Sequence, residues 1–212
     1  HHPDGFEGRE RDRLETLFAH FGSQRLLTLT RVLETGSNRL NELCHRLHLR
    51  RLWYATDDAM VAGEPVIMLR NDYQRGLFNG DRGLVLNVER PDDEEPRAMA
   101  VFRRGSRFVP YRLDGLRNHL DLAYAMTVHK SQGSEFADVC LLLPDEPIPL
   151  LTRELAYTGL TRASRSVILV GSPELLTHAA THPVDRHGGP RQRLGTSGSG
   201  RCCGGQSSNP ET

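Results

Sequence analysis

The sequence predicts an α/β fold in which a parallel sheet carries a smaller antiparallel β insertion. Strand-like apolar runs alternate with helix-like segments toward both ends of the chain, which is the pattern of a parallel α/β sheet. Between residues 63 and 118 the apolar runs become short and are separated by Gly- and Asp-containing turns, a pattern typical of an antiparallel meander or small barrel. A β module within this region is therefore expected to be inserted into the α/β unit.

The first part of the chain reads as helix, strand, helix. Residues 7–21 carry apolar residues at helical spacing, and residues 24–33 are dense in leucine and valine, as in a strand. After Gly36, Ser37 is a suitable N-cap for a second helix. We expect the apolar stripe of that helix to be buried. The stripe consists of Leu40, Leu43, Cys44 and Leu47.

The insertion is expected to cover residues 75–118, and residues 63–74 are expected to form a strand segment of the parallel sheet. Within the insertion, short apolar runs are separated by an Asn-Gly-Asp turn at Asn79, an acidic loop at 91–96 and an Arg-Gly-Ser turn at Arg104. Asn-Gly and Gly-Asp pairs supply the positive φ angles that hairpins need. The apolar runs are 84–88, 98–102 and 108–113.

The last part of the chain returns to the alternating pattern. Strands are expected at 122–127, 138–143 and 166–170, with a helix over 150–163. Ser172 and Pro173 together predict the capped start of a final helix. From residue 183 the apolar content falls and Gly, Ser and Arg dominate, so residues 183–212 are expected to be disordered.

Composition limits the function classes. Lys+Arg and Asp+Glu both number 27, so no net basic charge favours nucleic acid, and any DNA contact must be local. No apolar run approaches the ~20 residues that span a bilayer, and we expect a cytoplasmic protein with no membrane contact. Cys202 and Cys203 have no second pair at ligand spacing, so no metal site is expected.

The strongest motif is residues 127–136, Thr-Val-His-Lys-Ser-Gln-Gly-Ser-Glu-Phe, between two buried strands. A strand that ends in Thr127 and turns into a helix presents a hydroxyl and free N–H groups at the carboxyl edge of a sheet. Open α/β sheets bind ligands at that edge. Gly133 permits close approach of the backbone, and Glu135 can accept a hydrogen bond from a ribose hydroxyl.

The second motif is residues 153–163, Arg-Glu-Leu-Ala-Tyr-Thr-Gly-Leu-Thr-Arg-Ala. Residues four apart share a helix face, so Thr158 and Arg162 point the same way. An arginine supplied across a cleft to a γ-phosphate stabilises the charge that develops in phosphoryl transfer.

At these two segments the chain resembles motifs V and VI of superfamily 1 helicases. The sequence of the two segments is most similar to the RecD type, the alpha subunit of exodeoxyribonuclease V. Residues 63–73 and 76–83 also look like RecD sequence, and the resemblance covers roughly residues 24–180. It implies a C-terminal motor domain fragment that contains a UvrD-like helicase C-terminal domain. The fold it implies is RecA-like, a P-loop NTPase-type parallel sheet with an inserted SH3-like β module.

The resemblance also implies an organisation along the chain. Residues 1–62 would hold a connector and the start of the second RecA-like domain, and residues 63–74 a strand segment of it. Residues 75–118 would be the SH3-like module, residues 119–182 the part with motifs V and VI, and residues 183–212 the tail.

Functional residues follow from the positions that match the family motifs. Thr127 and His129 would face single-stranded DNA, with Asn71 as a further DNA contact. Gln132, Gly133 and Glu135 would bind the nucleotide. Arg162 would be both a nucleotide contact and the catalytic arginine finger.

One departure from the family pattern concerns ATP. The phosphate-binding Gly-x-x-x-x-Gly-Lys-Ser/Thr loop does not occur in the sequence, whose one lysine is Lys130. ATP and Mg²⁺ would therefore be bound mainly by an N-terminal motor domain, and this chain alone is expected to be inactive. The whole would be an ATP-dependent 5′–3′ DNA helicase of recombinational repair, with the other exodeoxyribonuclease V subunits, RecB and RecC, as partners.

Two other functions compete with this one. A conjugative relaxase-type helicase uses similar motifs, and a catalytically silent single-strand-binding scaffold would keep the fold but not the chemistry. Read singly, His129 is an ordinary loop histidine and Arg162 a solvated helix arginine. Tyr157 and Phe136 read as core aromatics rather than base-stacking platforms. The intact Gln132-Gly133 pair, Glu135 and Arg162 argue against a decayed site.

Overall fold

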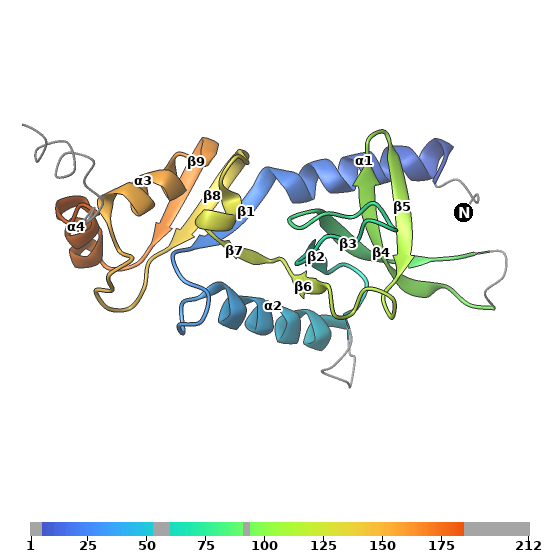
Figure 1. Cartoon of the computed structure of the whole chain (residues 1–212), viewed down its shortest axis with the longest axis horizontal. Helices are drawn as coiled ribbons and strands as arrows, with labels where there is room; N and C mark the ends of the chain where they lie inside the picture. Colours follow the sequence, from blue (N-terminus) through green and yellow to red (C-terminus); the bar gives the residue numbers. More distant parts are fainter. Residues whose placement is uncertain (1–5, 53–59, 91–93, 185–212) are drawn as a thin grey trace, which may run out of the picture.

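The structure is a computed structural model that describes residues 6–52, 60–90 and 94–184. Its first sheet has four strands in the order β7-β1-β8-β9, and each neighbouring pair is parallel (Figure 1). The predicted α/β fold with a parallel sheet is confirmed. The strands are β1 (Gln24–Thr28), β7 (Ala125–Thr127), β8 (Phe136–Leu142) and β9 (Ala163–Val170).

The second sheet has five strands in the order β5-β4-β3-β2-β6, and all its pairings are antiparallel. In Figure 1 it lies at the end of the molecule away from α3 and α4. The expected antiparallel meander is present, with Gly80 and Gly105 in its turns at positive φ. The strands are β2 (Pro65–Met68), β3 (Arg82–Val88), β4 (Arg97–Arg104), β5 (Arg107–Arg112) and β6 (Leu120–Leu122).

Two strands differ from the expectation. β2 was expected in the parallel sheet, but it pairs antiparallel with β3 and β6, so the second sheet extends beyond residues 75–118. A short apolar run that is buried on both faces looks the same in either kind of sheet. The expected strand 122–127 is divided into β6 and β7, because the chain passes from one sheet to the other at Ala123 and Tyr124.

The helices lie close to their expected places. Ser172 accepts a hydrogen bond from the Leu175 N–H, and Pro173 opens the last helix, so the predicted cap is confirmed. Thr152 caps α3 in the same way through the Leu155 N–H, which makes this helix shorter than the expected 150–163. The helices are α1 (Gly8–Ser23), α2 (Ser37–Leu52), the 3-10 turn η1 (His129–Ser131), α3 (Arg153–Leu160) and α4 (Pro173–Thr181).

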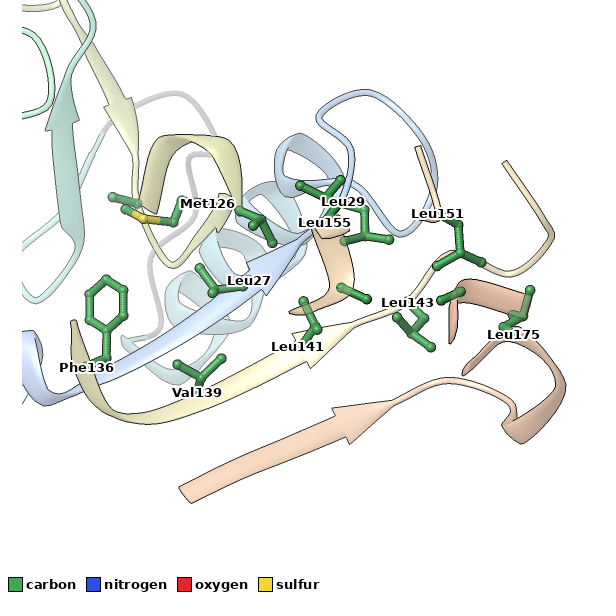
Figure 2. Close-up of a cluster of buried hydrophobic side chains, with 14 of the residues drawn as sticks. Leu27, Leu29, Met126, Phe136, Val139, Leu141, Leu143, Leu151, Leu155 and Leu175 are labelled. Atoms are coloured by element: carbon green, nitrogen blue, oxygen red, sulfur yellow. The ribbon is translucent and has the colours of Figure 1, made fainter. Parts of the chain in front are cut away.

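The main core lies between one face of the parallel sheet and helices α3 and α4. Leu27 and Leu141 are fully buried at its centre. Figure 2 shows Phe136 at one end of this cluster and Leu143 with Leu175 at the other, so the core follows β8 along its length. None of the helices in the described ranges has the length and apolar character needed to cross a membrane.

Helix α2 buries a polar face rather than its apolar stripe. Leu43 and Leu47 are 44% and 54% exposed and Leu40 and Cys44 are half-buried, so the expected burial of the stripe is met only in part. The Asn41 amide instead donates to the Leu122 and Ala125 carbonyls and accepts from the Ala125 N–H. Backbone groups with no strand partner at the crossing between the sheets need such partners. Helix α2 is therefore held to the crossing by hydrogen bonds.

A buried carboxylate completes this junction. Glu64 is fully buried, and its Oε1 lies 2.6 Å from His45 Nδ1 and accepts from the Tyr124 hydroxyl, while Oε2 accepts from the Val61 N–H. Burial, with the Glu64 carboxylate beside it, raises the pKa of Tyr124 far above its ordinary value. The network joins α2, the start of β2 and the crossing to β7.

The tail predicted for residues 183–212 lies outside the described residues except for Pro183 and Val184, as do Cys202 and Cys203.

Candidate functional site

The 127–136 motif begins at the carboxyl end of β7, as expected. In the strand register Thr127 pairs with Thr28 of β1, and Thr28 pairs on its other side with Leu142, the last residue of β8. The Thr127 Oγ1 accepts a hydrogen bond from the Lys130 N–H in the first part of the short turn η1. The threonine is half-buried at the carboxyl edge of the sheet.

Backbone bonds and one buried hydroxyl hold the start of this loop. The Val128 N–H donates to the Thr28 carbonyl, which ties the loop to β1. Ser131 is fully buried, and its hydroxyl donates to the Val128 carbonyl at 2.7 Å. The side chains of His129 and Gln132 are thereby left exposed.

His129 lies between two cavities. One, of about 610 Å³, is lined by Thr127, His129, the segment 29–33 and the segment 148–150. The other, of about 570 Å³, is lined by His129, Gln132 and residues of α3 and α4. Thr127 and His129 therefore share one cavity at the carboxyl edge, and Gln132 opens onto the other.

After Gln132 the loop returns to the opposite edge of the sheet. Gly133 has a φ of 79°, a conformation that glycine adopts without strain, and nothing lies within 4 Å of a Cβ built there. The chain enters β8 at Phe136, six residues before Leu142. At about 3.3 Å per residue this distance is roughly 20 Å. Glu135 is exposed at this amino end.

Arg162 lies at the same amino end. It follows the end of α3, and its carbonyl accepts from the Phe136 N–H where β9 begins beside β8. Its Nε donates to the Thr158 carbonyl and its Nη1 donates to the Ser134 carbonyl. The cation thus interacts favourably with the C-terminal end of α3 and is fixed to the motif loop. Arg162 and the segment 133–135 form one group.

The predicted residues therefore occupy both edges of the sheet. Thr127 and His129 lie at the carboxyl edge, whereas Gly133, Glu135 and Arg162 lie at the amino edge, with Gln132 on the path between them. The whole motif was expected at the carboxyl edge, and this is wrong for its second half. The loop is long enough to run back along the sheet, which spacing alone does not reveal.

Asn71 is separate from the other six residues. It lies in the loop between β2 and β3 of the second sheet, and its side chain is used within that loop. Its Nδ2 donates to the Tyr73 hydroxyl, and its Oδ1 accepts from the Asn79 N–H.

Two further expectations concerned aromatic residues. Phe136 is buried in the core as predicted, but Tyr157 is 67% exposed on α3 and is not a core residue. The Ser134 carbonyl was not predicted as the partner of Arg162, because a backbone acceptor has no residue signature. The Glu64 network was not predicted either, although an acidic residue directly before a buried strand was a usable signal. The described ranges contain no cluster of three or more His, Cys, Asp or Glu residues suited to a metal ion.

Known proteins match the segment that carries both motifs. Residues 122–170 match the UvrD-like helicase C-terminal domain family. The chain is 36% identical over 148 residues to the RecBCD enzyme subunit RecD of Mycobacterium tuberculosis, covering 70% of this chain and 23% of that protein. It is 35% identical over 191 residues to RecD of Mycolicibacterium smegmatis, covering 90% of this chain and 32% of that protein.

A third relative is the ATP-dependent RecD2 DNA helicase of Deinococcus radiodurans, 37% identical over 110 residues, which are 52% of this chain and 14% of that protein. Among solved structures, the Pif1 helicase of Candida albicans aligns with a TM-score of 0.42 at 14% identity, covering 74% of this chain and 49% of that one. A Bacteroides Pif1 helicase in complex with ADP-AlF3 and ssDNA aligns with a TM-score of 0.40 at 17% identity, covering 68% of this chain and 40% of that one.

The chain spans between about a quarter and a third of the length of the RecD proteins just described. Residues 122–170 contain β7, η1, β8, α3 and β9. The matched segment therefore includes every predicted site residue except Asn71. Residues 122–170 therefore belong to the UvrD-like helicase C-terminal domain family, and the chain that carries them is a relative of RecD.

Proposed function

We propose that this chain is the C-terminal motor part of an ATP-dependent DNA helicase that moves 5′ to 3′ on single-stranded DNA in recombinational repair, as an exodeoxyribonuclease V alpha subunit. One observation carries the proposal. A single loop, residues 128–135, joins Thr127 and His129 at one edge of the parallel sheet to Glu135 and Arg162 at the other. A motor needs such a connection, because a change at the nucleotide must move a contact with DNA.

The carboxyl edge is the proposed place of the DNA strand. The Thr127 hydroxyl and the His129 ring line one cavity, and hydroxyl and imidazole groups are suitable donors to phosphate oxygens. Asn71 is proposed as a further contributor from the second sheet.

The amino edge is the proposed place of the nucleotide. Gln132, Gly133 and Glu135 would contact ATP, with the exposed Glu135 carboxylate accepting a ribose hydroxyl. Arg162 is fixed through Nε and Nη1, so its guanidinium is held ready for a γ-phosphate presented by another domain. ATP and Mg²⁺ would be bound mainly by that domain, which would supply the phosphate-binding loop that this sequence lacks.

RecB- and RecC-type proteins are the proposed partners. Two relatives are named as subunits of the RecBCD enzyme, and matches of this kind span most of the present chain. Affinity purification of the natural protein from its own cells, followed by mass spectrometry, tests the proposal. Recovery of the protein without either partner would contradict it and favour a helicase that acts alone.

The decisive experiment substitutes Arg162 in the natural protein, tested together with the domain that would carry the phosphate-binding loop. Arg162→Ala should lower single-strand-stimulated ATP turnover by about 10³- to 10⁵-fold and abolish unwinding, because the guanidinium stabilises charge that develops in the transition state. ATP affinity should change little. Arg162→Lys should not restore activity, since one ammonium does not reproduce the planar fork.

Arg165→Ala is the matched control. Arg165 lies three residues away on β9, pairs with Asp138 and is largely exposed, so its loss should leave turnover within a few-fold of the parent. Equal loss in both variants, or an active Arg162→Ala protein, would contradict the arginine-finger role. The second result would favour a silent single-strand-binding scaffold.

The chain by itself should not hydrolyse ATP, because half of the nucleotide site is proposed to lie on another domain. A phosphate-release assay with and without single-stranded DNA checks this. Turnover that is stimulated by DNA and removed by Arg162→Ala would show that the chain contains a complete site.

A further inference from the structure

Two large aromatic side chains stand in solvent on the second sheet. In the loop between β2 and β3, Tyr73 is 77% exposed and Phe78 is 45% exposed. Their ring centroids are 6.2 Å apart and the rings are nearly perpendicular, at 78°. Within the described ranges from residue 60 to residue 122 they are the only large apolar side chains that are exposed. The loop therefore presents one isolated aromatic pair.

The pair is displayed on a rigid frame. The Asp72 carboxylate accepts from the Arg75 N–H and guanidinium, and the Asp81 carboxylate accepts from the Phe78 N–H. Leu77, between the two rings in sequence, is fully buried in the core of the second sheet. A ring held in place before binding loses little conformational entropy when a ligand arrives.

Asn71 holds the tyrosine in particular. Its side chain bonds to the Tyr73 hydroxyl at 3.1 Å and to the Asn79 N–H at 2.8 Å, so it spans the two ends of the loop. Both polar atoms of the Asn71 amide are thus engaged inside the loop. Asn71 acts on a ligand through Tyr73, as a positioning residue.

One arginine lies against the Phe78 ring, and another adjoins the loop in sequence. The Arg104 guanidinium carbon lies 5.5 Å from the centre of the Phe78 ring, and the same guanidinium pairs with Asp81. Arg70, next to Asn71, is exposed and has no hydrogen bond or ion pair with any residue of the described ranges. Aromatic faces for bases beside cations for phosphates are the combination that binds single strands without sequence preference.

We infer that Tyr73 and Phe78 form a stacking platform for one or two unpaired DNA bases, with Arg70 against the adjoining phosphate. The inference rests on the proposed function, to which it adds a second DNA contact on the antiparallel sheet. A protein partner fits less well, because a stable interface needs roughly 800 Å² on each side and the pair has no exposed apolar neighbours.

The test measures binding of a fluorescein-labelled oligo(dT) to the whole chain by anisotropy. Tyr73→Ala and Phe78→Ala should each weaken binding by about 5- to 150-fold, the range for loss of one base–aromatic stack. Tyr73→Phe keeps the ring but loses the bond from Asn71, so it should weaken binding as Asn71→Ala does and less than Tyr73→Ala. Gln74→Ala changes an exposed neighbour and should stay within about 2-fold of the parent. Circular dichroism verifies that each variant is folded.

Salt dependence separates stacking from charge. Tyr73→Ala should leave the slope of log affinity against log salt unchanged, whereas Arg70→Ala should reduce it by about 0.7, the value for one phosphate contact on a single strand. Asn71→Ala should weaken binding in the parent but add nothing in the Tyr73→Ala background, since it acts through that ring. Additive losses would overturn the positioning role.

A photochemical experiment gives a direct readout. Irradiation of the parent with an oligonucleotide that contains 5-iodouracil should crosslink a base to Tyr73 or Phe78, as mapped by mass spectrometry. If His129→Ala weakens binding but Tyr73→Ala and Phe78→Ala do not, the platform is wrong and the proposed function stands. If the parent does not bind the oligonucleotide, both the platform and the proposed DNA contacts of this chain are wrong.

Discussion

Two loops of this molecule follow buried strands and carry polar residues, but their own side chains take different parts in holding them. In the loop 128–135 after β7, the backbone-held loop, internal bonds join backbone groups except for the one from the Ser131 hydroxyl, while Thr127 and Arg162 bind the loop from outside. The loop 69–81 after β2, the side-chain-held loop, also has backbone bonds, but its own Asn71, Asp72 and Asp81 side chains cap N–H groups or pair with arginines.

The difference decides which groups are available to a ligand. In the first loop the charged and amide side chains point into solvent, as at Glu135 and Gln132. In the second loop Asn71, Asp72 and Asp81 bond within the loop itself, and two aromatic rings stand exposed beside them. Loops with similar composition can therefore offer different chemistry, depending on whether their own polar side chains bond within the loop.

The largest stability effect should come from a carboxylate in the side-chain-held loop. Asp81→Ala removes the acceptor of the Phe78 N–H and the partner of Arg104, and should lower the free energy of unfolding by about 1–3 kcal/mol. Glu135→Ala, in the backbone-held loop, should change it by no more than ~0.5 kcal/mol. Urea denaturation compares the two. Equal costs would remove the distinction between the loops.

A smaller effect is expected where the backbone-held loop does use a side chain. Ser131→Ala removes the bond from the buried hydroxyl to the Val128 carbonyl and should cost about 1 kcal/mol. Faster amide hydrogen exchange over 128–135, with no change over 69–81, would locate the loss. No change in exchange or stability would mean that the backbone alone fixes this loop.

The smallest effect is a pH dependence confined to the side-chain-held loop. The Arg75 guanidinium and N–H hold the pKa of Asp72 below its usual range. The stabilisation from a lowered carboxyl pKa is complete above the unfolded value of about 3.9 and is lost as the pH falls through the folded value. The parent should therefore lose more stability than Asp72→Asn between about pH 5 and pH 2. Parallel curves for the two proteins in chemical denaturation would contradict this contribution of Asp72.

Local signals predicted much of the fold. Turn residues such as Asn79-Gly80 separated the antiparallel strands correctly, and Ser172 with Pro173 marked the start of α4. Long-range bonding was not visible in the sequence. The buried face of α2 is polar because Asn41 and His45 find partners about 80 and 19 residues away, and helical periodicity carries no trace of those partners.

The sequence motifs named the candidate residues of the site but not their geometry. The two motifs named Thr127, Glu135 and Arg162, and the structure brings Arg162 to the loop through the Ser134 carbonyl. That the loop spans the height of the sheet depends on the register of β7 and β8, which follows from tertiary pairing rather than from spacing. The exposure of Tyr73 and Tyr157 was invisible for the same reason, since an isolated tyrosine reads equally as core or surface.

The crossing between the sheets has a mechanical consequence. Only Ala123 and Tyr124 separate the last residue of β6 from the first residue of β7, and the crossing is anchored by Asn41 and by the Glu64 network. A segment this short has no slack. A pull on the antiparallel sheet would therefore reach Thr127 as a rigid displacement along β7. Tension in a DNA strand bound to both sheets would be transmitted from one sheet to the other rather than absorbed by the crossing.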